Sequence, residues 1–217
     1  MSVVLPLLVR VFRRSFPSSE LLLIDDGSTD GSRSWIQAFA KGKPYIRVMM
    51  HTHNVGIAKT YQELYRRARG DVIVLFSLDG EWDPSDAVNL AQTLMIKRYD
   101  VVVGVRTHKQ YTVWRRVVSS FYNKLTAGLF GVPTRDAGSI KAIRKVVTAD
   151  IPIISAGVFD EAERIIRASK LGYRIGFVDV HHNAAQKKRR GIRMAHIYQA
   201  VVDMLRVFVD IHLSTRL

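Results

Sequence analysis

The chain has 217 residues, 47% of them hydrophobic and 24% charged, which is the composition of an ordinary globular domain and excludes a disordered chain or a collagen. It contains no cysteine, which excludes disulfides, thiolate nucleophiles and thiolate metal sites. Thirty-three Lys and Arg against 19 Asp and Glu leave a net charge of +14, so the surface should attract phosphate groups.

Short runs of Val, Ile and Leu alternate with longer segments of helical period, the pattern of a parallel sheet wound with helices. Strands are predicted at residues 2–5, 21–24, 46–49, 72–76, 101–105 and 174–180. Helices are predicted at residues 32–40, 57–69, 85–97, 113–129 and 159–171. The strand runs are almost continuously apolar, as expected where both faces of a sheet are covered. We expect one α/β domain over residues 1–180, followed by a basic, amphipathic extension over residues 181–217.

The strongest local signal follows the strand predicted at residues 21–24. The sequence IDDGSTDGS places Asp25 and Asp26 at the carboxyl end of a strand and before a helix, and Gly27 allows a sharp turn. Ligands of α/β sheets bind at such ends, where an aspartate can accept hydrogen bonds from a nucleobase or a ribose. A solvated turn closed by an aspartate cap explains either acid equally well.

A second group of polar side chains follows the strand predicted at residues 72–76. Oxygen-bearing side chains occupy alternate positions there, at Ser77, Asp79, Glu81 and Asp83. In an extended backbone, alternate side chains point to one side, and hard oxygen ligands suit Mg²⁺ or Mn²⁺ bound together with a diphosphate. We interpret Asp79 as a metal ligand and Asp83 as the cap of the helix that follows.

Taken in order, these blocks resemble family 2 glycosyltransferases of the GT-A fold, and most of all the polyprenyl-phosphate (dolichyl-phosphate) mannose or glucose synthases. The resemblance runs from about Leu21 to Arg193 and rests on IDDGSTDGS, NVG, GDVIVLFSLDGEWDP, VVVGVR, FDEAERIIRASKLGYRI and VDVHH. It implies a Rossmann-like, mostly parallel sheet flanked by helices. It also implies an inverting transfer of a sugar from a nucleotide diphosphate to polyprenyl phosphate, assisted by Mg²⁺ or Mn²⁺.

The resemblance assigns roles to individual positions of this sequence. Those implied to bind the nucleotide are Asp25, Asp26, Gly27 and Asn54. Those implied to hold the metal are Asp79 and Glu81, and those implied to bind the donor or acceptor phosphates are Arg106, Arg116, Ser120 and Arg190. The catalytic residues are then Asp79, Arg106 and Glu163. Glu161 is an alternative to Glu163, and an i,i+4 pair between Glu163 and Arg167 is the plain structural reading.

The sequence departs from the family pattern in two places. The family usually opens with a strand, Pro, an aromatic residue, Asn-Glu-Glu and a full helix, whereas Pro6 is followed here by LLVR and the first helix is shortened. The start is therefore truncated or rearranged, or the nucleotide pocket lacks one wall. Ser77 stands where the family has its first acid, which removes a negative charge from the metal site. A catalytically impaired homologue that binds nucleotide sugars is the first alternative function.

The last part of the chain combines a basic block with apolar residues of helical period. The basic residues are Lys187, Lys188, Arg189, Arg190 and Arg193. An amphipathic helix on a membrane surface and a helix packed in the core explain this pattern equally well. No run of about 18 uncharged apolar residues occurs, which argues against a membrane-spanning helix. At the start of the chain the basic residues follow the apolar run instead of preceding it, which argues against a secretory signal. We expect a cytoplasmic protein, peripheral at the cytoplasmic face of the membrane. A basic nucleic-acid-binding module is the remoter alternative, because no recognition motif accompanies the charge.

Overall fold

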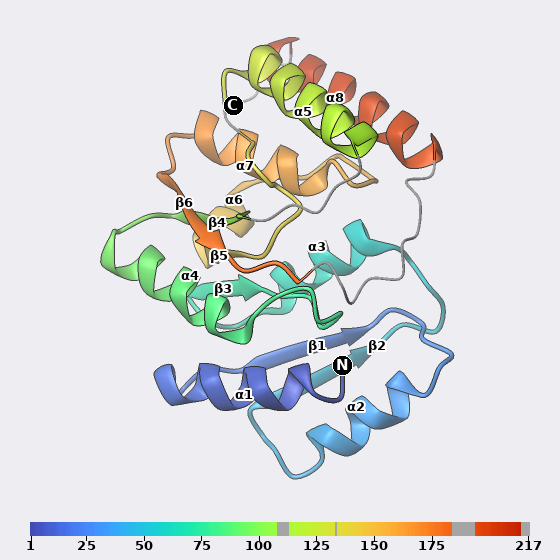
Figure 1. Ribbon diagram of the computed structural model, residues 1–217, viewed down its shortest axis with the longest axis vertical. Helices are drawn as coiled ribbons and strands as arrows, with labels where there is room; N and C mark the ends of the chain where they lie inside the picture. Colours follow the sequence, from blue (N-terminus) through green and yellow to red (C-terminus); the bar gives the residue numbers. More distant parts are fainter. Residues whose placement is uncertain (108–112, 133, 184–193, 214–217) are drawn as a thin grey trace.

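The computed structural model describes residues 1–107, 113–132, 134–183 and 194–213, and these form an α/β fold in which helices flank a divided sheet (Figure 1). The strands are β1 (Leu21–Asp25), β2 (Ile46–Met50), β3 (Val72–Leu75), β4 (Val101–Arg106), β5 (Lys141–Arg144) and β6 (Ile175–Val180). The helices are α1 (Val4–Ser15), α2 (Ser32–Ala40), α3 (Ile57–Arg67), α4 (Pro84–Ile96), α5 (Val113–Phe130), α6 (Lys145–Asp150), α7 (Asp160–Lys170) and α8 (Met194–Leu213). The predicted α/β class is confirmed.

The strands form two separate sheets. β1 and β2 pair in parallel, and the second sheet has the order β3-β5-β4-β6. Only β5 runs against its neighbours, because it is antiparallel to both β3 and β4 whereas β4 and β6 are parallel. β3, β4 and β6 therefore point the same way, and their carboxyl ends lie at one edge of the sheet.

Two features of the fold differ from the sequence-based prediction. The prediction of a strand at residues 2–5 is wrong. These residues form a turn and the start of α1, in which Leu5 and Leu8 are buried at helical spacing. A short apolar run has the same composition in a strand and in a buried helix, so periodicity could not separate them. β5 and α6 were not predicted, since β5 has only four residues and begins with a lysine.

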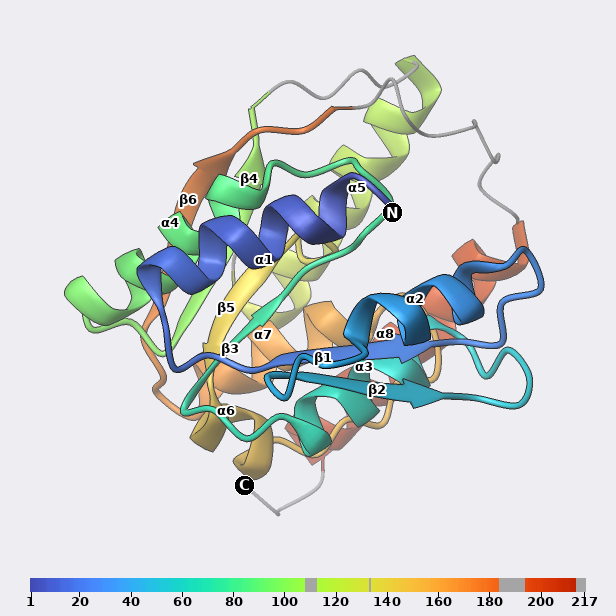
Figure 2. The same cartoon turned by 90° about the horizontal axis from the view of Figure 1, so that it is seen from below.

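Apolar side chains of the second sheet pack against helices on both faces. Val102 and Ala142 pack on Leu90 and Leu94 of α4. On the other face, Val101, Val103 and Ile143 pack against residues of α3, α6 and α7, namely Tyr65, Val147 and Ile165. This alternation along β4 is the strand period of two. Below this sheet, α1 lies beside α4 and reaches over to β1 and β2 (Figure 2).

The C-terminal helix α8 is packed against the body of the protein. Met204 and Val207 are buried with Phe130 of α5 and with Phe159 and Ile166 near α7, and Figure 1 shows α5 and α8 side by side. Arg167 of α7 donates to Asp210 of α8 at 2.6 Å. Within the ranges given above, no helix combines the length and the apolar character that crossing a membrane requires.

Candidate active site

Asp25 ends β1 and directs its carboxylate back to its own loop. The side chain is buried, and Oδ2 accepts hydrogen bonds from the Ser28 backbone N–H at 3.2 Å and from Arg33 Nε at 3.1 Å. Burial would raise the pKa of Asp25, but the bonds from Ser28 and Arg33 outweigh it and lower the pKa. These bonds fix the first turn of the loop after β1.

Asp26 joins this loop to the loop that follows β2. Its two carboxylate oxygens accept hydrogen bonds from the backbone N–H groups of Val55 at 2.9 Å and Gly56 at 3.1 Å. His51 lies between two acids, with Nδ1 2.8 Å from Asp26 Oδ1 and Nε2 2.9 Å from Glu63 Oε2. The hydrogen bonds to Asp26 and Glu63 raise the pKa of His51, so the imidazolium form is favoured.

Gly27 lets the two loops touch. Its φ of 74° lies in the left-handed region, and a Cβ at this position would lie 2.5 Å from the carbonyl carbon of His53 and 2.6 Å from the Asn54 nitrogen. No residue other than glycine fits so close to another backbone. The structure therefore brings together all four residues predicted to bind the nucleotide, with Asn54 exposed beside the loop that Asp25, Asp26 and Gly27 form.

The polar group after β3 divides into an exposed and a buried part. Asp79 is exposed, and its Oδ1 accepts a hydrogen bond from the Glu81 N–H at 3.1 Å. Glu81 is buried instead, with Oε2 3.4 Å from Nε2 of His182, which follows β6. Asp83 caps α4 by accepting from the Ser85 N–H at 2.8 Å, so its interpretation as a cap is confirmed.

Arg106, at the carboxyl end of β4, is held by Asp136. The Arg106 side chain donates from Nη2 to Asp136 Oδ1 at 2.8 Å, and its backbone N–H donates to Oδ2 at 2.9 Å. The guanidinium carbon lies 5.9 Å from the ring centre of Trp82, which itself packs against His182. Asp136 adopts φ = 49°, a left-handed conformation that non-glycine residues rarely take. His182, which the resemblance favours together with His181 as a residue near the donor phosphates, joins the site, and so does Asp136, to which the sequence-based assignment gave no role.

Glu163 is fully buried, and its carboxylate accepts hydrogen bonds from the backbone of the preceding loop. Its carboxylate accepts hydrogen bonds from the N–H groups of Ile154 and Ser155, and Arg167 Nε donates to it at 2.7 Å. The pairing with Arg167 is thus present in the structure. Glu161 is also buried and forms an ion pair with Lys141 of β5.

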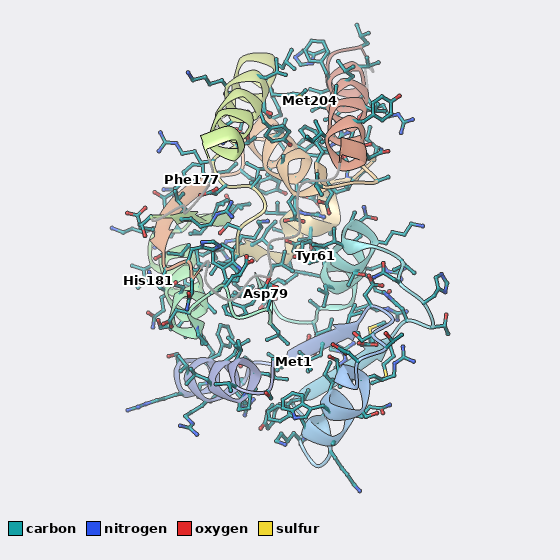
Figure 3. All side chains as sticks on the ribbon, turned by 45° about the vertical axis from the view of Figure 1, so that its right-hand side comes forward. Met1, Tyr61, Asp79, Phe177, His181 and Met204 are labelled. Carbon is teal, nitrogen blue, oxygen red and sulfur yellow. The ribbon has the colours of Figure 1, made fainter. Side chains whose placement is uncertain are left out.

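A cavity of about 700 Å³ opens between β1 and β3, and residues at the carboxyl ends of both strands line it. Asp25, Asp26, Ser77 and Tyr61 are among its lining residues. Asp79 lies near Tyr61 in the middle of the molecule (Figure 3). Burial and the charges of Glu161, Asp160 and Asp79 raise the pKa of Tyr61. Arg106 is not among the residues that line this cavity; it lies near Trp82, at the carboxyl end of β4.

Three predicted phosphate-binding residues cannot be placed in this arrangement. Arg116 and Ser120 lie in the part of α5 where the structure describes the backbone only, and Arg190 lies outside the described residues.

The site offers few protein ligands for a metal ion. Among the residues that the structure describes, no three His, Asp or Glu side chains are placed to hold one. Of the two predicted metal ligands, only Asp79 is exposed, since Glu81 is buried against His182. One accessible carboxylate fits a divalent ion that takes its other oxygens from a diphosphate and water, which is a common arrangement for Mg²⁺.

Comparison with known proteins identifies the family. The model of "Glycosyl transferase family 2" matches residues 2–157. The chain belongs to this family. It is 29% identical over 189 residues to an undecaprenyl-phosphate 4-deoxy-4-formamido-L-arabinose transferase of Shewanella sediminis, an alignment that covers 86% of this chain and 56% of that protein. It is 26% identical over 204 residues to a dodecaprenyl-phosphate galacturonate synthase of Rhizobium johnstonii, covering 91% and 59%. The chain thus spans less than two thirds of these relatives.

Solved structures of glycosyltransferases have the same GT-A fold. Glucosyl-3-phosphoglycerate synthase from Mycobacterium tuberculosis, in complex with UDP, has a TM-score of 0.69 at 20% identity, covering 92% of this chain and 75% of that one. A mannosyltransferase from Pyrobaculum calidifontis, in complex with GDP-Man and Mn²⁺, has a TM-score of 0.60 at 19% identity, covering 93% and 61%. The family 2 chain therefore has the fold that its sequence predicted.

The His51 bridge predicts a pH-dependent contribution to stability. Because the folded-state pKa of His51 is raised, this contribution is complete below pH about 6.5, the ordinary histidine pKa, and is lost as pH rises through the raised value. We expect His51→Gln to lower the free energy of unfolding by about 1 kcal/mol at pH 6 and by less at pH 9. Urea unfolding followed by circular dichroism measures both values. His53→Gln is the matched control, because His53 is exposed on the same loop, and an equal loss in both variants would contradict the bridge.

The contacts of Glu163 predict a structural cost for its neutralisation. Glu163→Gln removes the charge that pairs with Arg167 and one acceptor of the 154–155 backbone, so we expect a loss of about 2 kcal/mol in unfolding free energy. Glu20→Gln is the control, since Glu20 forms a partly exposed pair with Arg47 whose loss costs about 0–1 kcal/mol. Equal unfolding midpoints for the two variants would show that Glu163 is not an anchor of this loop.

Proposed function

We propose that this family 2 chain transfers a sugar from a nucleotide diphosphate to polyprenyl phosphate. The observation that carries the proposal is that the carboxyl ends of β1 and β3 line one cavity, with Asp25 and Asp26 on one side and Ser77, two residues before Asp79, on the other. Two curated relatives have a polyprenyl phosphate in their names, which supports this class of acceptor. The structural neighbours with bound UDP or GDP-Man support a nucleotide sugar as the donor.

In this proposal, the loop after β1 forms the wall for the nucleotide. Asp25 and Asp26 hold the loop through Ser28, Val55 and Gly56, and Gly27 keeps it close to the exposed Asn54. A pocket preorganised in this way binds the base and ribose without first having to order its own backbone.

The phosphates would bind on the β3 and β4 side. Asp79 would hold Mg²⁺ or Mn²⁺ together with the donor diphosphate, and the metal would neutralise charge on the departing nucleotide. Arg106, oriented by Asp136, adds a fixed cation beside Trp82. Fixed cations stabilise the charge that grows on the leaving phosphate in the transition state. From the family resemblance, Arg116, Ser120 and Arg190 would bind the donor and acceptor phosphates.

The acceptor phosphate is already ionised near neutral pH, so an inverting displacement needs little help from a base. This agrees with the full burial of Glu163, which then acts as a positioning residue for the backbone at 154–155. We assign residues 1–180 to the transferase site and residues 181–217 to the extension that carries α8.

Turnover separates an active transferase from an impaired homologue. We expect the purified chain to release nucleotide diphosphate from a nucleotide sugar only with Mg²⁺ or Mn²⁺ and polyprenyl phosphate present. Asp79→Asn should lower that rate by roughly 100-fold or more, whereas Asp83→Asn should leave it unchanged because asparagine also caps a helix. Ser77→Asp should raise the rate by restoring a ligand. A donor screen with lipid extract, read by mass, measures the product. Nucleotide binding without turnover in any variant would establish the impaired homologue.

The exposed face of α8 supports attachment to a membrane surface. Opposite its buried face, α8 exposes apolar side chains at helical spacing: Tyr198, Val201, Leu205 and Val209, with exposed fractions of 72%, 41%, 54% and 50%. An amphipathic helix with such a face lies in the headgroup region of a bilayer. In this proposal the protein is peripheral at the cytoplasmic face.

Vesicle binding tests this surface. We expect the chain to co-sediment with anionic phospholipid vesicles and Leu205→Asn with Val209→Asn to weaken the binding several-fold. Ile96→Asn is the control, since Ile96 is also apolar and exposed but lies at the end of α4. Release by high salt would assign the attachment to charge, and retention would assign it to apolar burial. If the α8 and α4 variants bind alike, α8 is not the attachment surface.

A further inference from the structure

Arg33 is a cation at the two loops that we assign to the nucleotide, and the proposed function gives it no role. It is the second residue of α2, which begins on the side to which β1 and β2 point (Figure 2). Its Nε donates to Asp25 Oδ2 at 3.1 Å, and its Nη2 donates to the backbone carbonyl of His51. One guanidinium therefore joins the loop after β1 to the loop after β2. Because the two acceptors lie on different loops, they fix the orientation of the planar group.

The Asp25 carboxylate, in contrast, is nearly closed to a ligand. Its side chain is 1% exposed, whereas that of Arg33 is 37% exposed. The Ser28 N–H and Arg33 Nε already occupy Asp25 Oδ2. A ligand at these loops therefore contacts the guanidinium far more readily than the carboxylate, and Asp25 acts on the ligand through the cation that it orients.

The free donors of Arg33 select for an acceptor on the ligand. Nε and Nη2 are engaged, and Nη1 has no hydrogen-bond partner among the residues that the structure describes. Arginine has donors only, so a ligand atom that binds to Nη1 must be an acceptor. Uracil and guanine present a carbonyl oxygen where cytosine and adenine present an amino group, which is a donor. Nη1 thus matches the first two bases and opposes the other two.

We propose that Arg33 recognises the base of the donor nucleotide by donating from Nη1 to a carbonyl oxygen of uracil or guanine, with Asp25 as the positioning residue that holds it. This inference rests on the proposed function, because it requires a nucleotide at the Asp25–Gly27 loop. A donor whose orientation is fixed before binding loses little conformational entropy when the base arrives. An amino group in place of the carbonyl leaves two donors facing each other, so the wrong base is rejected as well as the right one bound.

Holding the two loops together is the structural alternative for Arg33, and Arg47 provides the comparison. Arg47 Nη1 donates to Glu20 Oε2 at 2.7 Å and to the Arg67 carbonyl at 3.1 Å, so it also joins a carboxylate to a backbone carbonyl. Its side chain is 27% exposed. Arg47 lies near the amino end of β2, away from the Asp25–Gly27 loop. Arg47→Met therefore removes a similar bridge and is the matched control for Arg33→Met.

Calorimetric titration of the full chain with nucleoside diphosphates and Mg²⁺ tests the proposal. The comparisons are UDP with CDP and IDP with ADP, because within each pair a carbonyl oxygen is exchanged for an amino group on the same ring. In the pair that binds more tightly, we expect the carbonyl base to bind about 10-fold or more tightly than the amino base. Arg33→Met should abolish this preference, and Arg47→Met should keep it. Ribose 5-diphosphate, which has no base, should bind equally to Arg33→Met and to the unchanged chain.

The outcomes separate this proposal from the proposed function. If UDP or IDP binds but the amino base of the pair binds equally well, or if Arg33→Met keeps the preference, Arg33 does not recognise the base, and the transferase function stands. The same holds if Arg33→Met weakens ribose 5-diphosphate as much as UDP, because Arg33 then only holds the loops. If none of the four nucleotides binds to the unchanged chain, both proposals fail.

A second variant covers the case in which Arg33→Met does not fold, which circular dichroism detects. Arg33→Lys retains a cation for Asp25 but has a single nitrogen, which cannot hold Asp25 and donate to a base in the geometry of a guanidinium. It should also lose the preference for the carbonyl base. A folded Arg33→Lys chain with the full preference would overturn the proposal.

Discussion

The relative position of β1 and β3 is the constraint on which the candidate site depends. The Asp25–Gly27 loop, for which we propose nucleotide binding, follows β1, and Asp79 follows β3. Among the described residues, no strand pairs with both β1 and β3. What joins the two sheets is the packing of α1 against α4 and of α3 against β1 and α6. The distance between the two halves of the site is therefore set by side-chain packing, which is less directional than a hydrogen-bonded ladder.

Buried charges organise the opposite side of the sheet. Lys141 of β5 and Glu161 of α7 are nearly inaccessible and pair with each other, and Arg167 joins Glu163 to Asp210 of α8. Such pairs contribute little net stability, but the loss of one partner leaves an uncompensated buried charge and is costly. These ion pairs therefore fix the position of α7 against β5 and of α8 against α7. The pair between Arg167 and Asp210 joins α8 to α7, and Glu163 of α7 accepts hydrogen bonds from the backbone at residues 154–155.

The sequence predicts elements well where the local pattern is sufficient and fails where a distant partner decides. The strand β4 and the helix cap at Asp83 could be predicted from residues next to each other in the sequence. The loop at Asp25–Gly27 was located by its position after a predicted strand. Residues 2–5 were predicted wrongly because an apolar run of that length fits a strand and a helix equally. β5 was missed because Lys141 is charged, and its burial depends on Glu161 and on the Ala137 carbonyl, to which its ammonium donates. His51 has its two acids 25 and 12 positions away, and no spacing rule connects them.

Asp136 orients Arg106, the cation that we propose binds phosphate. It accepts from both the backbone and the side chain of Arg106 while holding an unfavourable left-handed backbone conformation. A strained residue persists only where its surroundings determine its conformation. Here the two hydrogen bonds across 30 positions do so, and they fix the guanidinium near Trp82 before any ligand arrives. Because the Arg106 side chain is already ordered in the folded protein, binding of a ligand does not have to reduce its conformational entropy further. A cation fixed in this way can stabilise charge that appears only in the transition state, because it need not reorganise when that charge develops.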